Sequence, residues 1–191
     1  MRARGAVFAT GGEDFGEAVN FGAFPDDART LELAVRTAVA ENEPSVAALV
    51  EELRSTDAGR RGRAAEMLGE RGPKARAAVK ALSAVLADED LNVRYWAASA
   101  LGHIGPEAID AVPALVGALR TSFPGHGPKG PDRYFADARA VCAQALGRIG
   151  PGARTALPAL KEALGDTDRS VHDAAVEAIE RIEHAKPGGK P

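Results

Sequence analysis

The most restrictive feature of this chain is an internal repeat with a fixed period. A pair of leucines four residues apart returns twice at a distance of 33 residues and once at 45, which is the same period lengthened by 12 residues. The pairs are Leu49 and Leu53, Leu82 and Leu86, Leu115 and Leu119, and Leu160 and Leu164. A period of this length predicts stacked supersecondary units in which each unit packs mainly on its neighbours.

A second group of small and apolar residues recurs in step with the leucine pairs. Ala97, Leu101 and Gly102 have counterparts in the units before and after, namely Ala64, Leu68 and Gly69, and Cys142, Leu146 and Gly147. Apolar residues three and four positions apart in both halves of a unit predict amphipathic helices. Each unit therefore consists of a helix A, a short turn that contains Asp, a helix B, and a Gly-Pro pair that ends helix B.

The expected fold class is all-α: a right-handed α-α superhelix of four helix-pair repeats with an N-terminal capping helix. The predicted A helices lie near residues 44–55, 76–87, 109–120 and 154–165, and the predicted B helices near 58–71, 91–104, 134–149 and 168–184. The capping helix is expected between Phe24 and about Asn42. The repeat domain then spans 24–185, the glycine-rich residues 1–23 are expected to be loosely ordered or disordered, and 186–191 to form a flexible tail.

Composition narrows the classes of partner. Charged residues make up 27% of the chain and the formal net charge is -3, which lacks the basic excess that phosphate backbones select, so we expect no nucleic acid partner. No stretch approaches the roughly 18 consecutive apolar residues of a membrane span, and the N-terminus lacks the apolar run of a signal peptide. We therefore expect no membrane association and a cytoplasmic location. The single cysteine, Cys142, is expected to be a small buried residue, and the protein to be a monomer.

The repeat also has a recognisable motif. The segments DEDLNVRYWAASALGHIGPEAIDAVPALVGAL and DARAVCAQALGRIGPGARTALPALKEAL each combine an Asp turn, an Ala-rich helix that ends in Leu-Gly-x-Ile-Gly, and a Pro-Ala-Leu start to the next helix. In this they resemble the HEAT-like repeats of the phycobilisome-lyase type, over roughly residues 44–183. The resemblance implies a HEAT-like solenoid and a scaffold for protein binding, which is the role of most members, whereas some subgroups are enzymes.

The enzymatic subgroups require residues that can be sought in the sequence. Members that resemble deoxyhypusine hydroxylase hold two irons with His-Glu pairs, and this chain contains no His-Glu dipeptide. DNA glycosylases built from HEAT-like units need a basic groove, whereas the outward positions of the B helices are mixed in charge. No nucleophile with a neighbouring base, phosphate-binding loop or pair of carboxylates emerges by spacing. We therefore expect no catalytic residue, metal or cofactor, and keep a bilin-lyase-like, chromophore-handling component as the alternative.

Two groups of residues are candidates for binding a protein or peptide partner. The first is the concave face formed by the B helices, with a central patch of Tyr95, Ser99, His103, Gln144 and Arg148. The second is the 12-residue insertion, which lies within 121–133 between helix A and helix B of its unit. Its candidate contacts are Phe123, His126, Lys129 and Arg133, and the alternative is an insertion that is tolerated without a function. The identity of the partner is not encoded in these patterns.

A third group is a ladder of charges at the starts of the B helices. Arg61, Arg94 and Arg139 occupy the same position in successive units, and His172 follows them in the last unit. Asp57 and Asp90 precede Arg61 and Arg94 by four residues, and Asp168 precedes His172 by the same distance. Opposite charges at this place are expected to tie each turn to its helix and each unit to the next. The alternative is a row that binds anions.

Overall fold

A computed structural model describes residues 43–121 and 138–184 of the chain, and these residues are helical without any strand. The B helices are α3 (Ala58–Glu70), α5 (Leu91–Ile104), α7 (Ala138–Ile149) and α9 (Arg169–His184). The A helices are α2 (Val46–Glu52), α4 (Val79–Ala84), α6 (Val112–Arg120) and α8 (Leu157–Ala163). The prediction of an all-α fold is thereby confirmed. The predicted capping helix, residues 1–23, residues 186–191 and the insertion beyond Thr121 lie outside the described residues.

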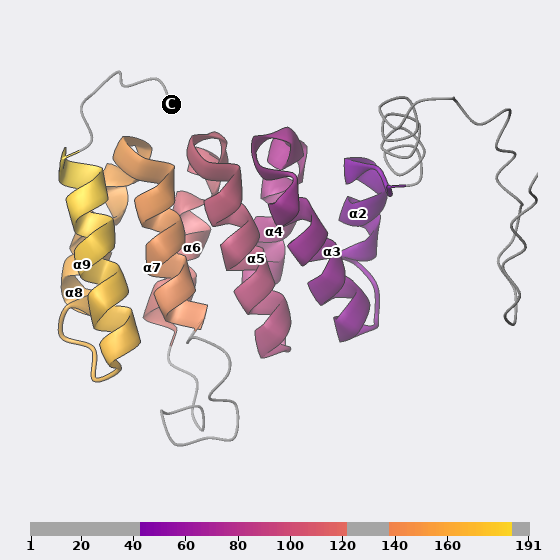
Figure 1. The fold of residues 1–191 in the computed structure, drawn as a ribbon. Helices are drawn as coiled ribbons and strands as arrows, with labels where there is room; N and C mark the ends of the chain where they lie inside the picture. The colour runs from indigo at the N-terminus through magenta and orange to yellow at the C-terminus, as the bar shows by residue number, and fades with distance from the viewer. Residues whose placement is uncertain (1–42, 122–137, 185–191) are drawn as a thin grey trace, which may run out of the picture. The chain divides into compact units, whose positions relative to one another are not determined.

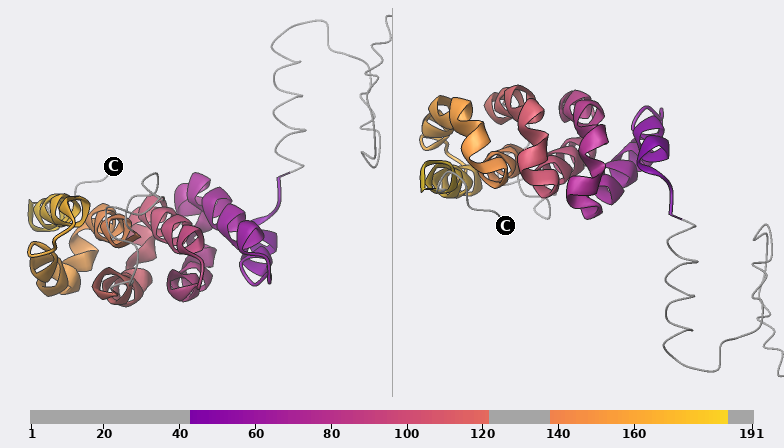
Figure 2. Two further views of the ribbon diagram at one scale, coloured as in Figure 1. Left: turned by 90° about the horizontal axis from the view of Figure 1, so that it is seen from below. Right: turned by 90° about the horizontal axis from the view of Figure 1, so that it is seen from above.

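The described helices belong to one compact unit, Pro44–Pro191, and form two layers. The B helices lie side by side in one layer and the A helices in the other, as the two views of Figure 2 show. Each A helix packs on the B helix that follows it, and each B helix packs on the next one, from α3 to α9 (Figure 1). This is the nearest-neighbour stacking that the 33-residue period predicts.

Short polar side chains begin helices α2, α3 and α5. Ser45 accepts a hydrogen bond from the backbone N–H of Ala48 at 3.1 Å at the start of α2, and Asp57 accepts one from Arg60 at 2.9 Å at the start of α3. Asp90 does the same for Asn92 at 2.8 Å at the start of α5. These bonds satisfy N–H groups that the first turn of a helix leaves without an intrahelical partner.

The connection from each B helix to the next A helix differs from the prediction. In place of an A helix that begins directly, a 3₁₀ segment comes first: η1 (Gly72–Ala78), η3 (Gly105–Ala111) and η4 (Gly150–Ala156). Each segment has the pattern Gly-Pro-x-Ala-x-x-Ala. The glycine has a positive φ, such as 74° at Gly105, and both alanines are buried in all three segments. The backbone of each segment kinks at its first alanine, as at Ala108 with φ -90° and ψ 18°. The small side chains on both sides of the kink fit against the core.

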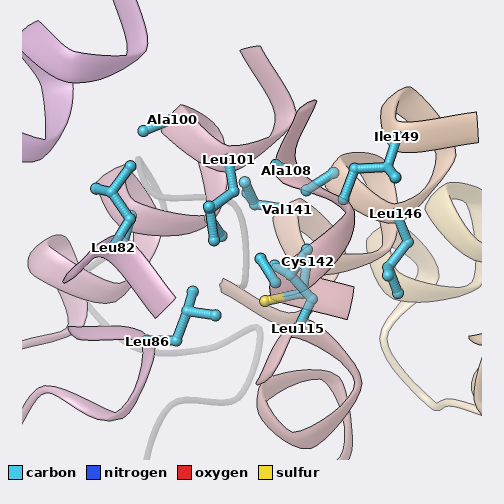
Figure 3. Packing of buried hydrophobic residues seen from close by; sticks show 14 of the residues in the cluster. Leu82, Leu86, Ala100, Leu101, Ala108, Leu115, Val141, Cys142, Leu146 and Ile149 are labelled. Carbon is cyan, nitrogen blue, oxygen red and sulfur yellow. The ribbon is translucent and has the colours of Figure 1, made fainter. Parts of the chain in front are cut away.

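The core consists of aliphatic side chains held between the two layers. Leu82, Leu101, Leu115 and Leu146 are fully buried, each within the sequence repeat that predicted them. Cys142 lies in the same core with Leu86 and Leu115, and it is 1% exposed, as expected for a small buried residue (Figure 3). Aliphatic burial of this kind is the main stabilising contribution in a solenoid of short helices.

Glycine and alanine set how closely the B helices approach one another. A Cβ placed on Gly69 would lie 3.1 Å from Cα of Ala100 in α5, and one on Gly102 would lie 3.1 Å from Cα of Ala145 in α7. At Gly147 the corresponding distance to Cα of Ala178 in α9 is 2.9 Å. Because these contacts are with backbone atoms, a side chain at any of the three glycines would push two helices apart. The glycines form a seam along the B layer.

The last helix departs from the seam. Glu180 stands where α3, α5 and α7 have Gly69, Gly102 and Gly147, and its side chain is exposed. Val176, whose counterparts Ala65, Ala98 and Ala143 are fully buried, is 37% exposed. A further B helix could not approach α9 as closely as α9 approaches α7, so α9 has the polar outer face typical of the end of a solenoid.

Candidate binding face and the arginine ladder

Two of the ladder arginines, Arg61 and Arg139, contact acids in the turn before the next B helix. Arg61 of α3 donates through Nε and Nη2 to the two carboxylate oxygens of Asp88, both at 2.8 Å. Arg139 of α7 donates through Nη1 to Oδ2 of Asp166 at 2.5 Å. In both pairs the acid follows the arginine by 27 residues, so each pair connects one B helix to the turn before the next.

The predicted acids of the ladder therefore need correction. Asp57, Asp90 and Asp168 do not form these ion pairs; their carboxylates accept hydrogen bonds from backbone N–H groups at the helix starts. The partners of Arg61 and Arg139 stand two residues earlier in an Asp-x-Asp pattern, Asp88 before Asp90 and Asp166 before Asp168. The repeated 27-residue distance between an Arg and an Asp is the sequence signal that could have identified them.

The two acids of each pattern have different tasks. Asp88 also accepts a hydrogen bond from the backbone N–H of Asp90 at 3.0 Å, and Asp166 accepts the same bond from Asp168 at 2.9 Å. The first acid thus fixes the turn and binds the preceding unit, while the second begins helix B. In the first turn Ser55 replaces the first acid and accepts from Asp57 at 3.2 Å.

These contacts act on the ionisation of the turn acids. Burial alone would raise the pKa of Asp88, but the hydrogen bonds from Arg61 and from the backbone of Asp90, with the nearby charges of Arg61 and Arg94, hold that pKa below its ordinary value. The hydrogen bond from the Ser170 hydroxyl likewise lowers the pKa of Asp168 against the opposing effect of burial. Both carboxylates are therefore stabilised in the charged form.

Arg94 occupies the middle of the ladder and has a different partner. The residue 27 positions after it is Thr121, at the start of the insertion, so the sequence offers no acid there. Arg94 instead donates through Nε to the backbone oxygen of Asp88, in the turn before its own helix. Arg61 and Arg139 thus join successive units, and Arg94 joins helix α5 to its own preceding turn, which are contacts of the kind that the structural interpretation of the ladder expects.

The aromatic residues of α5 lie at the junction with α3. The rings of Tyr95 and Trp96 meet edge to face, with centroids 5.2 Å apart and an interplanar angle of 89°. A Cβ on Gly62 of α3 would lie 3.7 Å from Cδ1 of Trp96, so Trp96 covers this glycine. Trp96 therefore contacts the neighbouring unit, and Tyr95 remains half-buried beside it.

The other residues of the predicted patch lie on α5 and α7, which pack on each other. Ser99 and His103 are one turn apart on α5, and Oγ of Ser99 is 3.5 Å from Nδ1 of His103. Gln144 and Arg148 occupy the equivalent positions of α7. A Cβ on Gly102 would lie 3.4 Å from Cδ of Arg148, so the stem of Arg148 crosses from α7 to the residue beside His103. Arg148 is thus placed beside Gly102 and next to His103, while Ser99 and Gln144 lie one turn earlier on the same two packed helices.

An open depression of about 680 Å³ lies at the ends of α7 and α9. Its lining consists of Gly147, Arg148, Gly150, Glu180, Arg181 and His184. The patch predicted from the sequence shares only Arg148 with this lining, because its other residues lie on the earlier helix or one turn away. The sequence analysis did not select Arg181 or His184 as candidate binding residues. Arg181 could have been selected because it occupies the same repeat position as Arg148.

The sequence led us to expect neither a metal site nor a membrane-spanning segment. Within residues 43–121 and 138–184, no group of three or more His, Cys, Asp or Glu side chains is placed to hold a metal ion. None of the helices in those ranges is both long and apolar enough to span a membrane. The predicted contacts Phe123, His126, Lys129 and Arg133 lie outside the described residues.

The two-layer fold, the glycine seam and the turn contacts define a helical solenoid of the HEAT type. The HEAT repeats family matches residues 46–125, and the PBS lyase HEAT-like repeat family matches residues 138–166. The chain therefore contains HEAT-like repeats over these residues, as its motif indicated. None of the curated proteins matches its sequence.

Solved structures with similar folds include engineered proteins. One is 26% identical, with a TM-score of 0.58 over 73% of this chain and 63% of its own length. Another is 28% identical, with a TM-score of 0.56 over 79% of this chain and 40% of its own length. The chain thus spans less than two thirds of either protein. The complex of CpcE and CpcF of phycocyanin lyase from Nostoc sp. PCC7120 is 23% identical, with a TM-score of 0.47 over 75% of this chain and 67% of that one.

Proposed function

We propose that this protein is a non-catalytic interaction scaffold that binds a protein or peptide segment on the face of its B helices. The observation that carries the proposal is the set of polar side chains that α5 and α7 present together: Ser99, His103, Gln144 and Arg148. Among the described residues, neither Gln144 nor Arg148 forms an ion pair or a side-chain hydrogen bond. Both side chains are therefore available to a partner.

The chemistry of this face suits a protein segment. Tyr95 offers a half-buried aromatic ring at one side of the patch, and Arg148 an exposed guanidinium at the other. Tyr and Arg are the residue types that most often dominate the energy of protein interfaces, because each combines apolar area with directional hydrogen bonding. Ser99 and Gln144 between them can both donate to and accept from an extended backbone.

The insertion between α6 and α7 is the second part of the proposed binding surface. Phe123, His126, Lys129 and Arg133 remain predicted contacts, based on a long Gly- and Pro-rich segment between two helices of an otherwise regular array. In this interpretation the B-helix face supplies the general binding surface, and the insertion contributes to the choice of partner.

A second candidate function rests on one observation. Because the PBS lyase HEAT-like repeat family matches residues 138–166, a bilin-lyase-like component that handles a chromophore is the alternative. It requires a bound tetrapyrrole in place of a protein segment. An absorption spectrum of the purified protein, with metal analysis, distinguishes this alternative.

The test of the proposal compares affinity purifications from a lysate of the source organism, analysed by mass spectrometry. The bait is the full chain, the variant Arg148→Glu on the B layer, or the control Lys80→Glu on α4 of the A layer, where the lysine is also exposed. A partner retained by the full chain and Lys80→Glu but lost by Arg148→Glu is the expected result. A partner that survives both substitutions would place the binding surface elsewhere, and a visible chromophore without a protein partner would favour the alternative.

A further inference from the structure

Three residues with basic side chains stand at one repeat position on successive B helices. His103 of α5, Arg148 of α7 and Arg181 of α9 are separated by the repeat distances of 45 and 33 residues, and all three are exposed. The equivalent residue of α3 is Glu70, also exposed. The row formed by His103, Arg148 and Arg181 thus runs across the helices, along the stack, and meets an acid at the α3 end.

The side chains of the two arginines in this row lie over glycines of the seam. The stem of Arg148 lies over Gly102 of the preceding helix, and that of Arg181 lies over Gly147, where a Cβ would be 3.6 Å from Cδ of Arg181. Each arginine therefore fills the shallow groove that a glycine leaves between two helices. Arg148 and Arg181 both line the open depression at the ends of α7 and α9.

The two arginines of the row differ in whether they form an ion pair. No described acid forms an ion pair with Arg148. Nη2 of Arg181 lies 2.5 Å from Oε1 of Glu177, one turn earlier on α9, and about half of each of these two side chains is exposed. A carboxylate from a partner would displace no ion pair at Arg148, where Glu180 lines the same depression, whereas at Arg181 it would compete with Glu177. Exposed pairs of this kind exchange readily because they are worth little in water.

The distance between helices sets the spacing of a matching ligand. Packed helices lie about 8 to 10 Å apart, and the Gly–Ala contacts place these at the close end of such a range. A peptide in the polyproline II conformation has three residues per turn and rises about 3.1 Å per residue, so side chains three residues apart lie on the same side, about 9 Å apart. One side chain in three of an extended peptide of this kind therefore falls on successive members of the row.

From this geometry we infer that the row of His103, Arg148 and Arg181 binds an extended acidic segment whose carboxylates recur at every third residue. Arg148 supplies the principal contact, and Glu70 at the α3 end disfavours a further acid there. The inference rests on the proposed function, because it names the chemistry of the segment that the B-helix face binds. It adds the spacing and the negative charge of the bound segment. These two claims can be wrong even if a partner binds to this face.

The test uses two fluorescein-labelled peptides of identical composition, measured by fluorescence anisotropy with the full chain at low ionic strength. One has glutamates at every third position in a Gly/Ser background, and the other has the same glutamates in one block. The spaced peptide should bind at least about fivefold more tightly, and Arg148→Gln should remove that preference. Arg181→Gln should cause a smaller loss, and Lys80→Gln, on the A layer, should change neither affinity.

Each other outcome identifies which claim has failed. Equal affinity of the two peptides, or no binding of either, overturns the inferred register. An unchanged preference in Arg148→Gln shows that the row is not the site, even if the peptides bind. If the partner captured by affinity purification is still lost in Arg148→Glu while the peptides show no preference, the proposed function stands and only the acidic register is wrong. Retention of that partner in Arg148→Glu contradicts the proposed function itself.

Discussion

Arg61 joins two successive turns of the stack through its contact with Asp88. Its Nε and Nη2 hold the two carboxylate oxygens of Asp88 at 2.8 Å, while Nη1 donates to the backbone oxygens of Ser55 and Thr56 at 2.9 and 3.1 Å. The turn before α3 and the turn before α5 are therefore bound to one guanidinium. Only 9% of the Arg61 side chain and 10% of the Asp88 side chain is exposed, so water contributes little to either group.

Replacing Asp88 should destabilise the fold substantially. Asp88→Asn keeps the shape of the side chain but removes the buried, hydrogen-bonded counter-charge of Arg61 and leaves only the exposed Glu89 at 3.9 Å. A charge-assisted hydrogen bond is worth roughly 1.5 to 3 kcal/mol. Asp110→Asn, at an exposed acid in η3, serves as the matched control and should change the free energy of unfolding by less than about 0.5 kcal/mol. Equal midpoints of chemical denaturation for the two variants would show that the ladder does not stabilise the stack.

Stability should also fall at acidic pH, because Asp88 and Asp168 become protonated there. The folded-state pKa values of Asp88 and Asp168 lie below the ordinary value of about 3.9, so the stability from these groups is present above about pH 4 and is lost as the pH falls through their folded-state pKa values. Thermal midpoints measured between about pH 5 and pH 3 should decrease more steeply for the unmodified chain than for Asp88→Asn. Parallel curves would rule out a contribution of Asp88 ionisation.

The same glycine substitution should have opposite effects at two positions. Gly147→Ala places Cβ 2.9 Å from Cα of Ala178, and forcing α7 and α9 apart should cost roughly 1 to 3 kcal/mol. Gly117 lies in α6, where a Cβ meets nothing within 4 Å, so Gly117→Ala should gain about 0.5 to 1 kcal/mol from helix propensity. Thermal unfolding of both variants measures the difference. A stabilised Gly147→Ala would mean that the seam tolerates a wider spacing.

The insertion can be tested separately from the fold. Shortening residues 121–133 to the length of the turn before α5 should leave helix content and the thermal midpoint nearly unchanged, since lengthening a surface loop changes closure entropy little. If the insertion contributes to partner choice, the shortened chain should bind the captured partner at least several-fold more weakly, as calorimetry would measure. Undiminished affinity would make the insertion a tolerated one.

The fold was predictable because its signal is repeated. The leucine pairs, spaced by 33 residues and once by 45, mark α2, α4, α6 and α8, and the Asp turns mark the starts of the B helices, so several copies of one weak pattern supported one another. The 3₁₀ segments were missed because a Gly-Pro pair predicts the end of a helix but leaves the conformation of the next residues open. Only the buried pair of alanines, three apart, distinguishes them from an ordinary turn.

The partners of the ladder were harder to predict than its arginines. Local spacing favoured acids four residues before Arg61 and Arg94, but a carboxylate at a helix start already accepts backbone N–H groups there. The actual partner of Arg61 belongs to the next unit, and this depends on how closely the B helices pack. The position of the proposed binding residue Arg148 on its helix follows from helix periodicity, whereas the place of its stem over Gly102 follows from the glycine seam.

The central claim, that a protein segment binds on the B-helix face, is tested most directly by site-specific photo-crosslinking in lysate. A photoreactive amino acid in place of Gln144, between α5 and α9, should give a discrete adduct, and the same group in place of Lys80 on the A layer should give none. Mass spectrometry of the adduct then identifies the bound segment. An adduct from position 80 alone, or none from position 144 under conditions where the partner is captured, would contradict the account.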